Sequence, residues 1–140
     1  MRLVCRVPAW VATLVVAAAI AYLTLARFDM DPDDVPRIPH LDKVVHFLMF
    51  GGLAWMAAVD YAAHLSGPRL RRVRPVLVVV VCAVGASLAG AAVEVAQGAM
   101  GLGRSEDVFD WLADTVGAVV GAAMAFVMIQ YWRQLLSRRQ

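Results

Sequence analysis

Three short stretches of this sequence place acidic, basic and amide side chains among apolar residues. Asp42, Lys43 and His46 are three and four residues apart, and Glu94 precedes Gln97 by three, so each set shares one face of a helix. The third stretch is a stripe of aspartates with the same spacing: Asp107, Asp110 and Asp114. An imidazole beside carboxylates can carry a proton, act as a general base or bind a metal. Basic side chains, here Lys43 and Arg104, can hold an anion.

The depth at which a charged residue lies in a membrane determines how strongly its presence calls for an explanation. A charge in the hydrocarbon of a bilayer costs at least about 2.5–3.5 kcal/mol on insertion scales. Asp107 and Asp110 can cap a helix start, whereas Glu94 and Asp114 lie too deep in their helices for a cap. We therefore expect a polar pocket formed by nine residues: Asp42, Lys43, His46, Glu94, Gln97, Arg104, Asp107, Asp110 and Asp114. The alternative is an ion-pair network, for instance Glu94 with Lys43 or Arg104, that only holds the helices together.

Other chemistries have weaker support. One histidine among scattered carboxylates is a poor metal signal, and His40 and His64 lie too far along the chain to complete a ligand set. We expect no metal and no cofactor. Cys5 and Cys82 should lie at different depths, which argues against a disulfide. The usual motifs of serine hydrolases, zinc proteases and phosphate-binding loops are missing from the sequence, so it offers no identifiable nucleophile.

The elements that must position these residues are long apolar segments. Apolar residues make up 61% of the 140 residues and charged residues 17%, which is too apolar for a water-soluble surface. Four segments reach the roughly 20 residues that cross a bilayer: 8–26, 44–65, 75–96 and 108–132. The first exceeds the ~7–15 apolar residues of a signal-peptide core, so we interpret it as a helix. The predicted fold is all-α: a four-helix transmembrane bundle in one domain, residues 1–140.

The arginines predict how the bundle is oriented. They precede the first segment, fill the second connection and follow the fourth segment: Arg2, Arg6, Arg69, Arg71, Arg72, Arg74, Arg133, Arg138 and Arg139. Those stretches should be cytoplasmic, which places both termini inside and the pocket at the outer face of the membrane. Asp60, near the inner end, is expected to pair with the arginines from Arg69 onward. A net charge of only +2, with its basic residues beside apolar segments, argues against a nucleic-acid partner.

Small residues predict where helices approach each other closely. Gly117 and Gly121 are four apart in the fourth segment, and the third carries Gly85 and Gly90. Such spacings let backbones pack tightly in lipid. The short glycine-rich connection at residues 98–103 predicts a tight hairpin between the third and fourth segments.

The polar motifs also share their order and spacing with a known family. They are Asp42-Lys43-Val-Val-His46 with Gly51, then Glu94-Val-Ala-Gln97, then Asp107-Val-Phe-Asp110 with Asp114-Thr-Val-Gly117 and Gly121. This pattern, from Asp42 to Gly121, resembles the VanZ-like family of small bacterial membrane proteins. Asp114 stands where that family usually has asparagine, which adds a possible charge. The resemblance implies a role at the cell envelope, because the name-giving member is associated with resistance to the lipoglycopeptide teicoplanin.

Four functions fit these features. The first is a pocket that binds or modifies an envelope component or lipid head group, with membrane lipids or a glycopeptide-type ligand as partners. In it, Lys43 and Arg104 would hold an anionic group, while Glu94, Asp110 and His46 set the charge of the site. The second is an enzyme with His46 or Glu94 as general base. The third is a proton-coupled carrier using Glu94 and Asp114, although no polar stripe continues to the inner side. The fourth is a structural scaffold.

Overall fold

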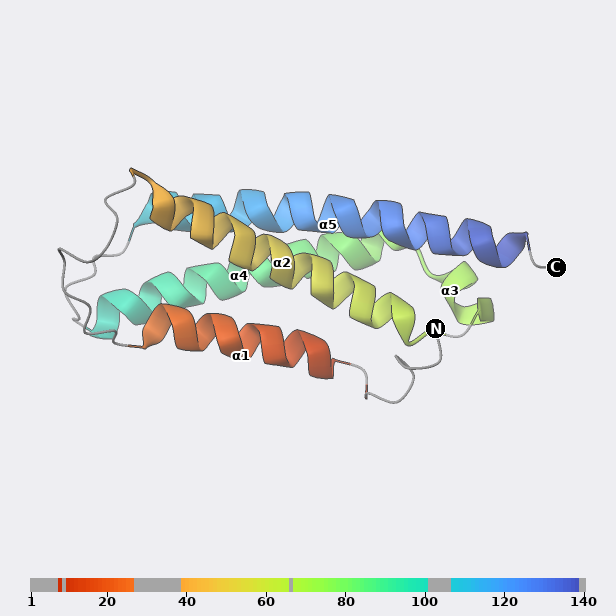
Figure 1. Cartoon of the computed structure of the whole chain (residues 1–140), viewed down its shortest axis with the longest axis horizontal. Coiled ribbons are helices and arrows are strands. Elements are labelled where there is room, and N and C mark those ends of the chain that lie inside the picture. Colours follow the sequence, from red (N-terminus) through yellow and green to blue (C-terminus); the bar gives the residue numbers. More distant parts are fainter. Residues whose placement is uncertain (1–7, 9, 27–38, 66, 101–106, 139–140) are drawn as a thin grey trace.

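The computed structural model describes residues 8, 10–26, 39–65, 67–100 and 107–138. These residues form helices: α1 (Val11–Leu25), α2 (Leu41–Ala63), α3 (Gly67–Arg72), α4 (Pro75–Met100) and α5 (Val108–Ser137). The helices α1, α2, α4 and α5 run along the long axis of the molecule, and the short α3 lies at the end where α5 finishes (Figure 1). The described part of the chain has no strand, so the all-α prediction is confirmed. Helix α3, within the predicted second connection, was not expected.

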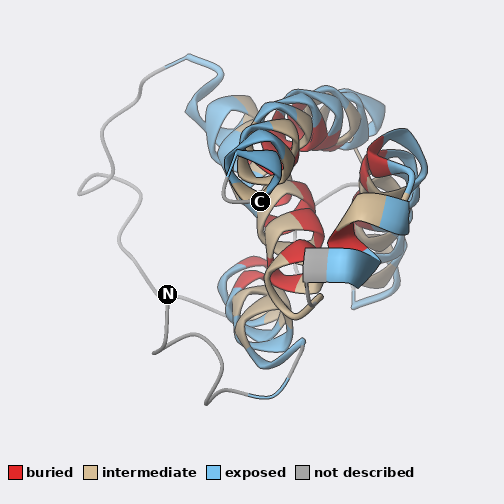
Figure 2. Cartoon of the chain, turned by 90° about the vertical axis from the view of Figure 1, so that its right-hand side faces the viewer, coloured by how far each residue is buried: buried red, intermediate tan, exposed pale blue. Residues whose placement is uncertain are grey.

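Three of the helices are long and apolar enough to cross a membrane: α2, α4 and α5. Helix α1 is apolar but has 15 residues, which at about 1.5 Å each reach only ~22 Å of a hydrocarbon core about 30 Å thick. Large apolar side chains such as Leu14, Leu88 and Val127 are exposed on the outside of the bundle, while buried residues face the spaces between helices (Figure 2). That distribution suits lipid rather than water. Helix α1 as a fourth span stays a prediction.

Helices α2 and α5 form the closest packing in the bundle. A Cβ added to Gly117 would overlap the backbone carbonyl of Phe47, and one added to Gly121 would overlap the carbonyl of Gly51. The predicted close approach is therefore confirmed at Gly117 and Gly121, and its partner helix is α2. Gly85 has nothing within 4 Å of its missing side chain, so it takes no part in such a contact.

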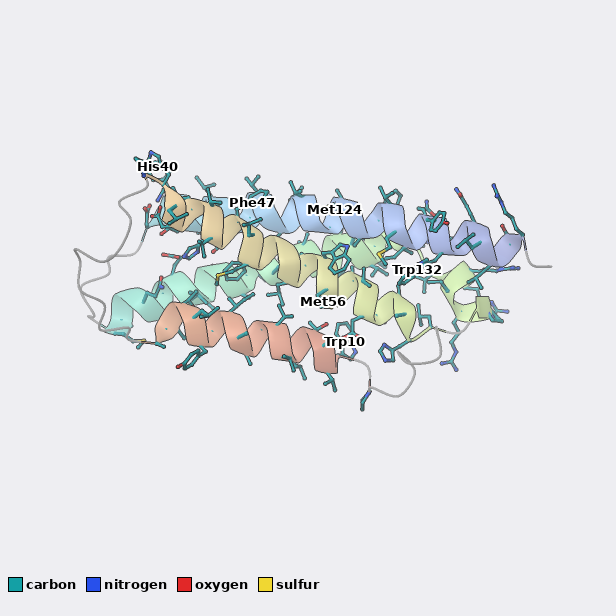
Figure 3. The ribbon with its side chains drawn as sticks, viewed as in Figure 1. Trp10, His40, Phe47, Met56, Met124 and Trp132 are labelled. Carbon is teal, nitrogen blue, oxygen red and sulfur yellow. The ribbon has the colours of Figure 1, made fainter. Side chains whose placement is uncertain are left out.

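Helix α1 is attached to the bundle by polar contacts near both of its ends. Close to its start, Thr13 donates its hydroxyl to Asp60 Oδ2 at 2.9 Å and its N–H to the same oxygen at 3.3 Å. Asp60 Oδ1 lies 3.1 Å from Nδ1 of His64, one turn later in α2. The expected pairing of Asp60 with arginines is wrong for the described residues, because Thr13 and His64 surround its carboxylate instead. Trp10, which Figure 3 shows at this end of the molecule, packs against Tyr61 with ring centroids 5.8 Å apart.

Candidate functional site

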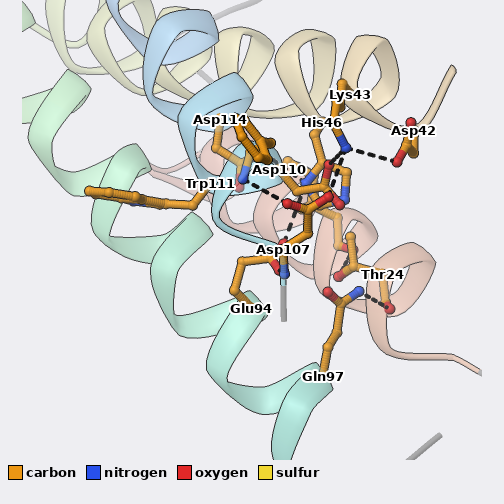
Figure 4. A network of polar contacts seen from close by, with 12 residues as sticks. Thr24, Asp42, Lys43, His46, Glu94, Gln97, Asp107, Asp110, Trp111 and Asp114 are labelled. Atoms are coloured by element: carbon orange, nitrogen blue, oxygen red, sulfur yellow. Dashed lines mark hydrogen bonds and ion pairs between the residues drawn. The ribbon is translucent and has the colours of Figure 1, made fainter. Parts of the chain in front are cut away.

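At the opposite end of the bundle, the first turns of α2 and α5 meet the last turns of α4 (Figure 1). This end holds eight of the nine predicted pocket residues, which we call the polar cluster: Asp42, Lys43, His46, Glu94, Gln97, Asp107, Asp110 and Asp114 (Figure 4). The ninth, Arg104, lies outside the described residues. Residues up to 68 positions apart in the chain, such as His46 and Asp114, are thus in contact because three helices begin or end at one level.

Lys43 organises the more exposed part of the cluster, its rim. The ammonium Nζ lies near three carboxylates: Asp110 Oδ1 at 2.8 Å, Asp107 Oδ2 at 2.9 Å and Asp42 Oδ2 at 3.2 Å. An ammonium has three hydrogens to donate, so these contacts use all of them. Lys43 is therefore not available to Glu94, and holding an anion would require it to leave a carboxylate.

Asp107 has two roles in the rim. It is the N-cap of α5, and its Oδ1 accepts the backbone N–H of Phe109 at 2.8 Å. Its other oxygen accepts from Lys43. The Lys43 ammonium, helped by the Phe109 N–H, lowers the pKa of the Asp107 carboxyl below its ordinary value, because both donors stabilise the charged form. The predicted capping role of Asp107 is confirmed, and it coexists with an ion pair.

A second, buried part of the cluster lies beneath the rim. His46, Glu94 and Asp114 are all buried, with Asp114 fully inaccessible. His46 Nδ1 lies 2.9 Å from Asp114 Oδ1 and 3.9 Å from Glu94 Oε1. Glu94 Oε2 accepts the backbone N–H of Asp107 at 3.2 Å. Within the described part of the chain, Glu94 Oε1 and Asp114 Oδ2 have no hydrogen-bond partner.

Asp114 is buried because helix α4 leaves room for it. A Cβ added to Gly90 would meet the Asp114 carboxylate at 2.5–3.0 Å, closer than real side chains approach. The sequence marked Gly90 only as a small residue for helix packing. Its position four residues before Glu94 puts it on the same face of α4, and that spacing is the signal that links the two.

Gln97 faces a different neighbour from the acids. Its Nε2 donates to the backbone carbonyl of Thr24 in α1 at 3.0 Å (Figure 4), so it joins α4 to α1 at the edge of the cluster. Thr24 was not predicted to take part, although it is a polar residue near the end of an apolar helix. Trp111 was also missed, and its indole N–H donates to the carbonyl of Ser87 at 3.3 Å.

The charge balance of the cluster sets the chemistry that it favours. Five of its residues carry carboxylates, whereas its bases are one lysine and one histidine. Two groups of three residues bring one ligand atom each to within 4.8 Å of one another: His46 with Glu94 and Asp114, and Asp42 with Asp107 and Asp110. The Lys43 ammonium already lies among the second group. The cluster as described thus attracts cations and hydrogen-bond donors more than anions.

Comparison with known proteins gives one match. A family model described as VanZ/LLP1 matches residues 7–129, a range that includes every residue of the polar cluster. Neither the curated proteins nor the solved structures gave a significant match.

Proposed function

Because the chain belongs to the VanZ/LLP1 family, we propose that it is a membrane protein whose polar cluster binds the polar head group of a cell-envelope component. The cluster would face outward from a bacterial plasma membrane, with α1 as a fourth span and both termini in the cytoplasm. Arginine distribution supports this orientation. The arginines of α3 and those at the end of α5 lie at the end of the bundle opposite the cluster (Figure 1), and arginines mark the cytoplasmic side.

The unpaired oxygens of Glu94 and Asp114 carry the proposal. Leaving a buried acceptor unsatisfied costs about 1–3 kcal/mol, and more for a charged one, so buried carboxylates in a purely structural cluster are expected to have donors on both oxygens. Here each of the two carboxylates has one oxygen without a donor among the described residues. A ligand that brings N–H or O–H groups would supply what the protein does not.

The same contacts indicate which part of the head group the cluster would bind. Lys43 is engaged by three aspartates, and the remaining side chains are mainly acceptors. An ammonium or hydroxyl group fits this site better than a phosphate does. We therefore propose an amine or sugar part of an envelope lipid, or of a glycopeptide-type ligand, in place of the anionic group that the sequence suggested.

Direct binding can be measured on the purified full chain in detergent. Phosphatidylethanolamine, whose head group has an amine, should raise the thermal unfolding temperature of the protein, whereas phosphatidic acid, whose head group is a phosphate alone, should raise it less. Asp114→Asn should remove the difference between the two lipids. Asp60→Asn changes a buried acid at the opposite end and serves as the matched control, which should keep the difference. Equal responses to both lipids in the wild-type chain would contradict binding through an amine.

A link to glycopeptide resistance needs a separate test. We expect expression of the chain in a teicoplanin-susceptible bacterium to raise the inhibitory concentration of that antibiotic. Glu94→Gln should be inactive at wild-type protein levels. If instead the variant loses activity only in proportion to its abundance, the cluster is a scaffold.

The contact between His46 and Asp114 favours a second candidate, an enzyme that acts on an envelope lipid. With Nδ1 held at 2.9 Å by Asp114, the imidazole would be oriented to accept a proton at Nε2, as a general base does. Incubation of the purified protein with labelled envelope lipids should then give a product that His46→Ala does not form. If no lipid class gives a product, the enzyme candidate is contradicted and head-group binding remains the proposed function.

A further inference from the structure

We propose that His46, Glu94 and Asp114 form a binding site for one divalent transition-metal ion such as Zn²⁺ or Mn²⁺. These residues come from three different helices, α2, α4 and α5, and each offers one ligand atom, with all three atoms within 4.8 Å of one another. Figure 4 shows their side chains next to the Lys43 contacts. The inference goes beyond head-group binding and does not require it.

The distances between the ligand atoms fit a site that needs only small shifts to hold an ion. His46 Nδ1 is 2.9 Å from Asp114 Oδ1 and 3.9 Å from Glu94 Oε1. Ligand atoms at the zinc bond lengths of about 2.0–2.2 Å in tetrahedral geometry are roughly 3.4 Å apart. The two observed separations lie on either side of that value, so each needs to change by only about 0.5 Å.

The unpaired oxygen of Glu94 is the observation that points to a ligand. Glu94 is 7% exposed, and its Oε1 faces His46 without a hydrogen-bond partner among the described residues. Asp114, fully buried, leaves its Oδ2 similarly unpaired. Two carboxylates in an apolar surrounding need compensating positive charge. Lys43, the lysine of the cluster, is committed to the rim aspartates, whereas one divalent cation would balance both buried charges.

The surroundings hold the three ligands in place. The other oxygen of Glu94 accepts the Asp107 N–H at 3.2 Å, and the ring of His46 stacks on Phe50 with centroids 6.3 Å apart. Asp114 is seated against Gly90. Supporting contacts of this kind orient ligands and tune metal affinity. One imidazole nitrogen with carboxylate oxygens suits zinc and manganese, whereas calcium prefers oxygen ligands alone.

The rim aspartates do not make a second site of this kind. Asp42, Asp107 and Asp110 also lie within the required distance of one another. The Lys43 ammonium contacts all three at 2.8–3.2 Å, so a cation is already present there. This difference predicts one ion for each chain rather than two.

The test is metal binding by the full chain in detergent, purified without a histidine tag and stripped with a chelator. After addition of Zn²⁺ or Mn²⁺ and removal of free ions, elemental analysis should give one ion per chain. Calorimetric titration should show at least tenfold weaker binding in Glu94→Gln and in Asp114→Asn. His64→Ala and Asp60→Asn, which change a histidine and a buried acid at the opposite end of the bundle, should bind as the wild type does.

Two results would overturn the inference: no ion retained by the wild-type chain, or equal retention by the wild-type chain and Glu94→Gln. The unfolding temperature of each variant in chelator establishes that it is folded, and His46→Ala replaces any variant that is not. Because no envelope component is present, a negative result leaves head-group binding intact. Head-group binding measured in chelator is likewise independent of the ion.

Discussion

Buried carboxylates occur at both ends of the bundle, and they differ in how they are paired. Asp60 and Glu94 are each 7% exposed, and Asp114 is 0% exposed. Asp60 has contacts to both oxygens, from Thr13 and from His64. Glu94 and Asp114 each keep one oxygen without a donor in the described part of the chain. The acids at the two ends are therefore similarly buried, and they differ in how many donors the described residues supply to them.

The difference arises from where the donors come from. Asp60 receives an N–H and a hydroxyl from the first turns of α1, and its imidazole partner is one turn away in the same helix. Such donors form with the helices themselves. Glu94 in α4 and Asp114 in α5 share the His46 imidazole, and among the described residues the other donor to them is the Asp107 N–H, which reaches one oxygen of Glu94. The first arrangement attaches a helix, and the second fits the ligand that we propose.

The largest expected effect on stability comes from disrupting the close contact between α2 and α5, the helices that carry buried acids at both ends of the bundle. Gly117→Ala would place a methyl group against the backbone of Phe47, where no flexible side chain can move aside. We expect a loss of about 2–3 kcal/mol in the free energy of unfolding, as for other overpacked sites, together with loss of both buried networks. Thermal unfolding in detergent measures it. Gly85→Ala, in open space, is the matched control, and similar stability of the two variants would mean that α2 and α5 are not in close contact.

A smaller effect on stability is expected when the buried acids of the two ends, Asp60 and Glu94, are substituted and compared. Asp60→Ala leaves the hydroxyl and the N–H of Thr13 without this acceptor, which should cost about 1–3 kcal/mol in the free energy of unfolding. Glu94→Gln retains the shape of the side chain and adds an N–H near the unpaired oxygens, so its unfolding temperature should stay the same or rise. Both variants are measured in chelator without added lipid. If Glu94→Gln is as unstable as Asp60→Ala, both acids are structural.

The sequence predicted the components of the cluster better than their partners. Spacing placed Asp42, Lys43 and His46 on one helical face, and the first-turn position of Asp107 indicated its cap. Spacing within one helix does not fix how far a neighbouring helix is rotated or shifted along its axis. For that reason the sequence predicted one pocket, and its division into a rim around Lys43 and a buried group of His46, Glu94 and Asp114 emerged only from the structure.

The same limit explains the errors at the other end of the bundle. The arginines near Asp60 in the chain suggested an ion pair, but the acid faces α1, whose depth the sequence does not set. Apolar composition predicted the helices, and α1 ends at Leu25, as expected from the predicted segment. Its length of 15 residues reflects a start at Val11, three residues later than the segment suggested.

The smallest expected effect on stability concerns the rim, where Lys43 pairs with the acids. Because Lys43 lowers the pKa of Asp107, this contact stabilises the folded protein at pH values above the ordinary pKa of about 3.8, and the stabilisation is lost as the pH falls through the lowered value. Lys43→Met removes the main cause of that shift. The unfolding temperature of the wild-type chain should therefore exceed that of Lys43→Met near pH 6, and the difference should shrink as the pH is lowered below 3.8. A difference that does not change with pH would show that Lys43 stabilises the rim by packing alone, and the contrast between paired and unpaired acids would then hold only for the buried residues.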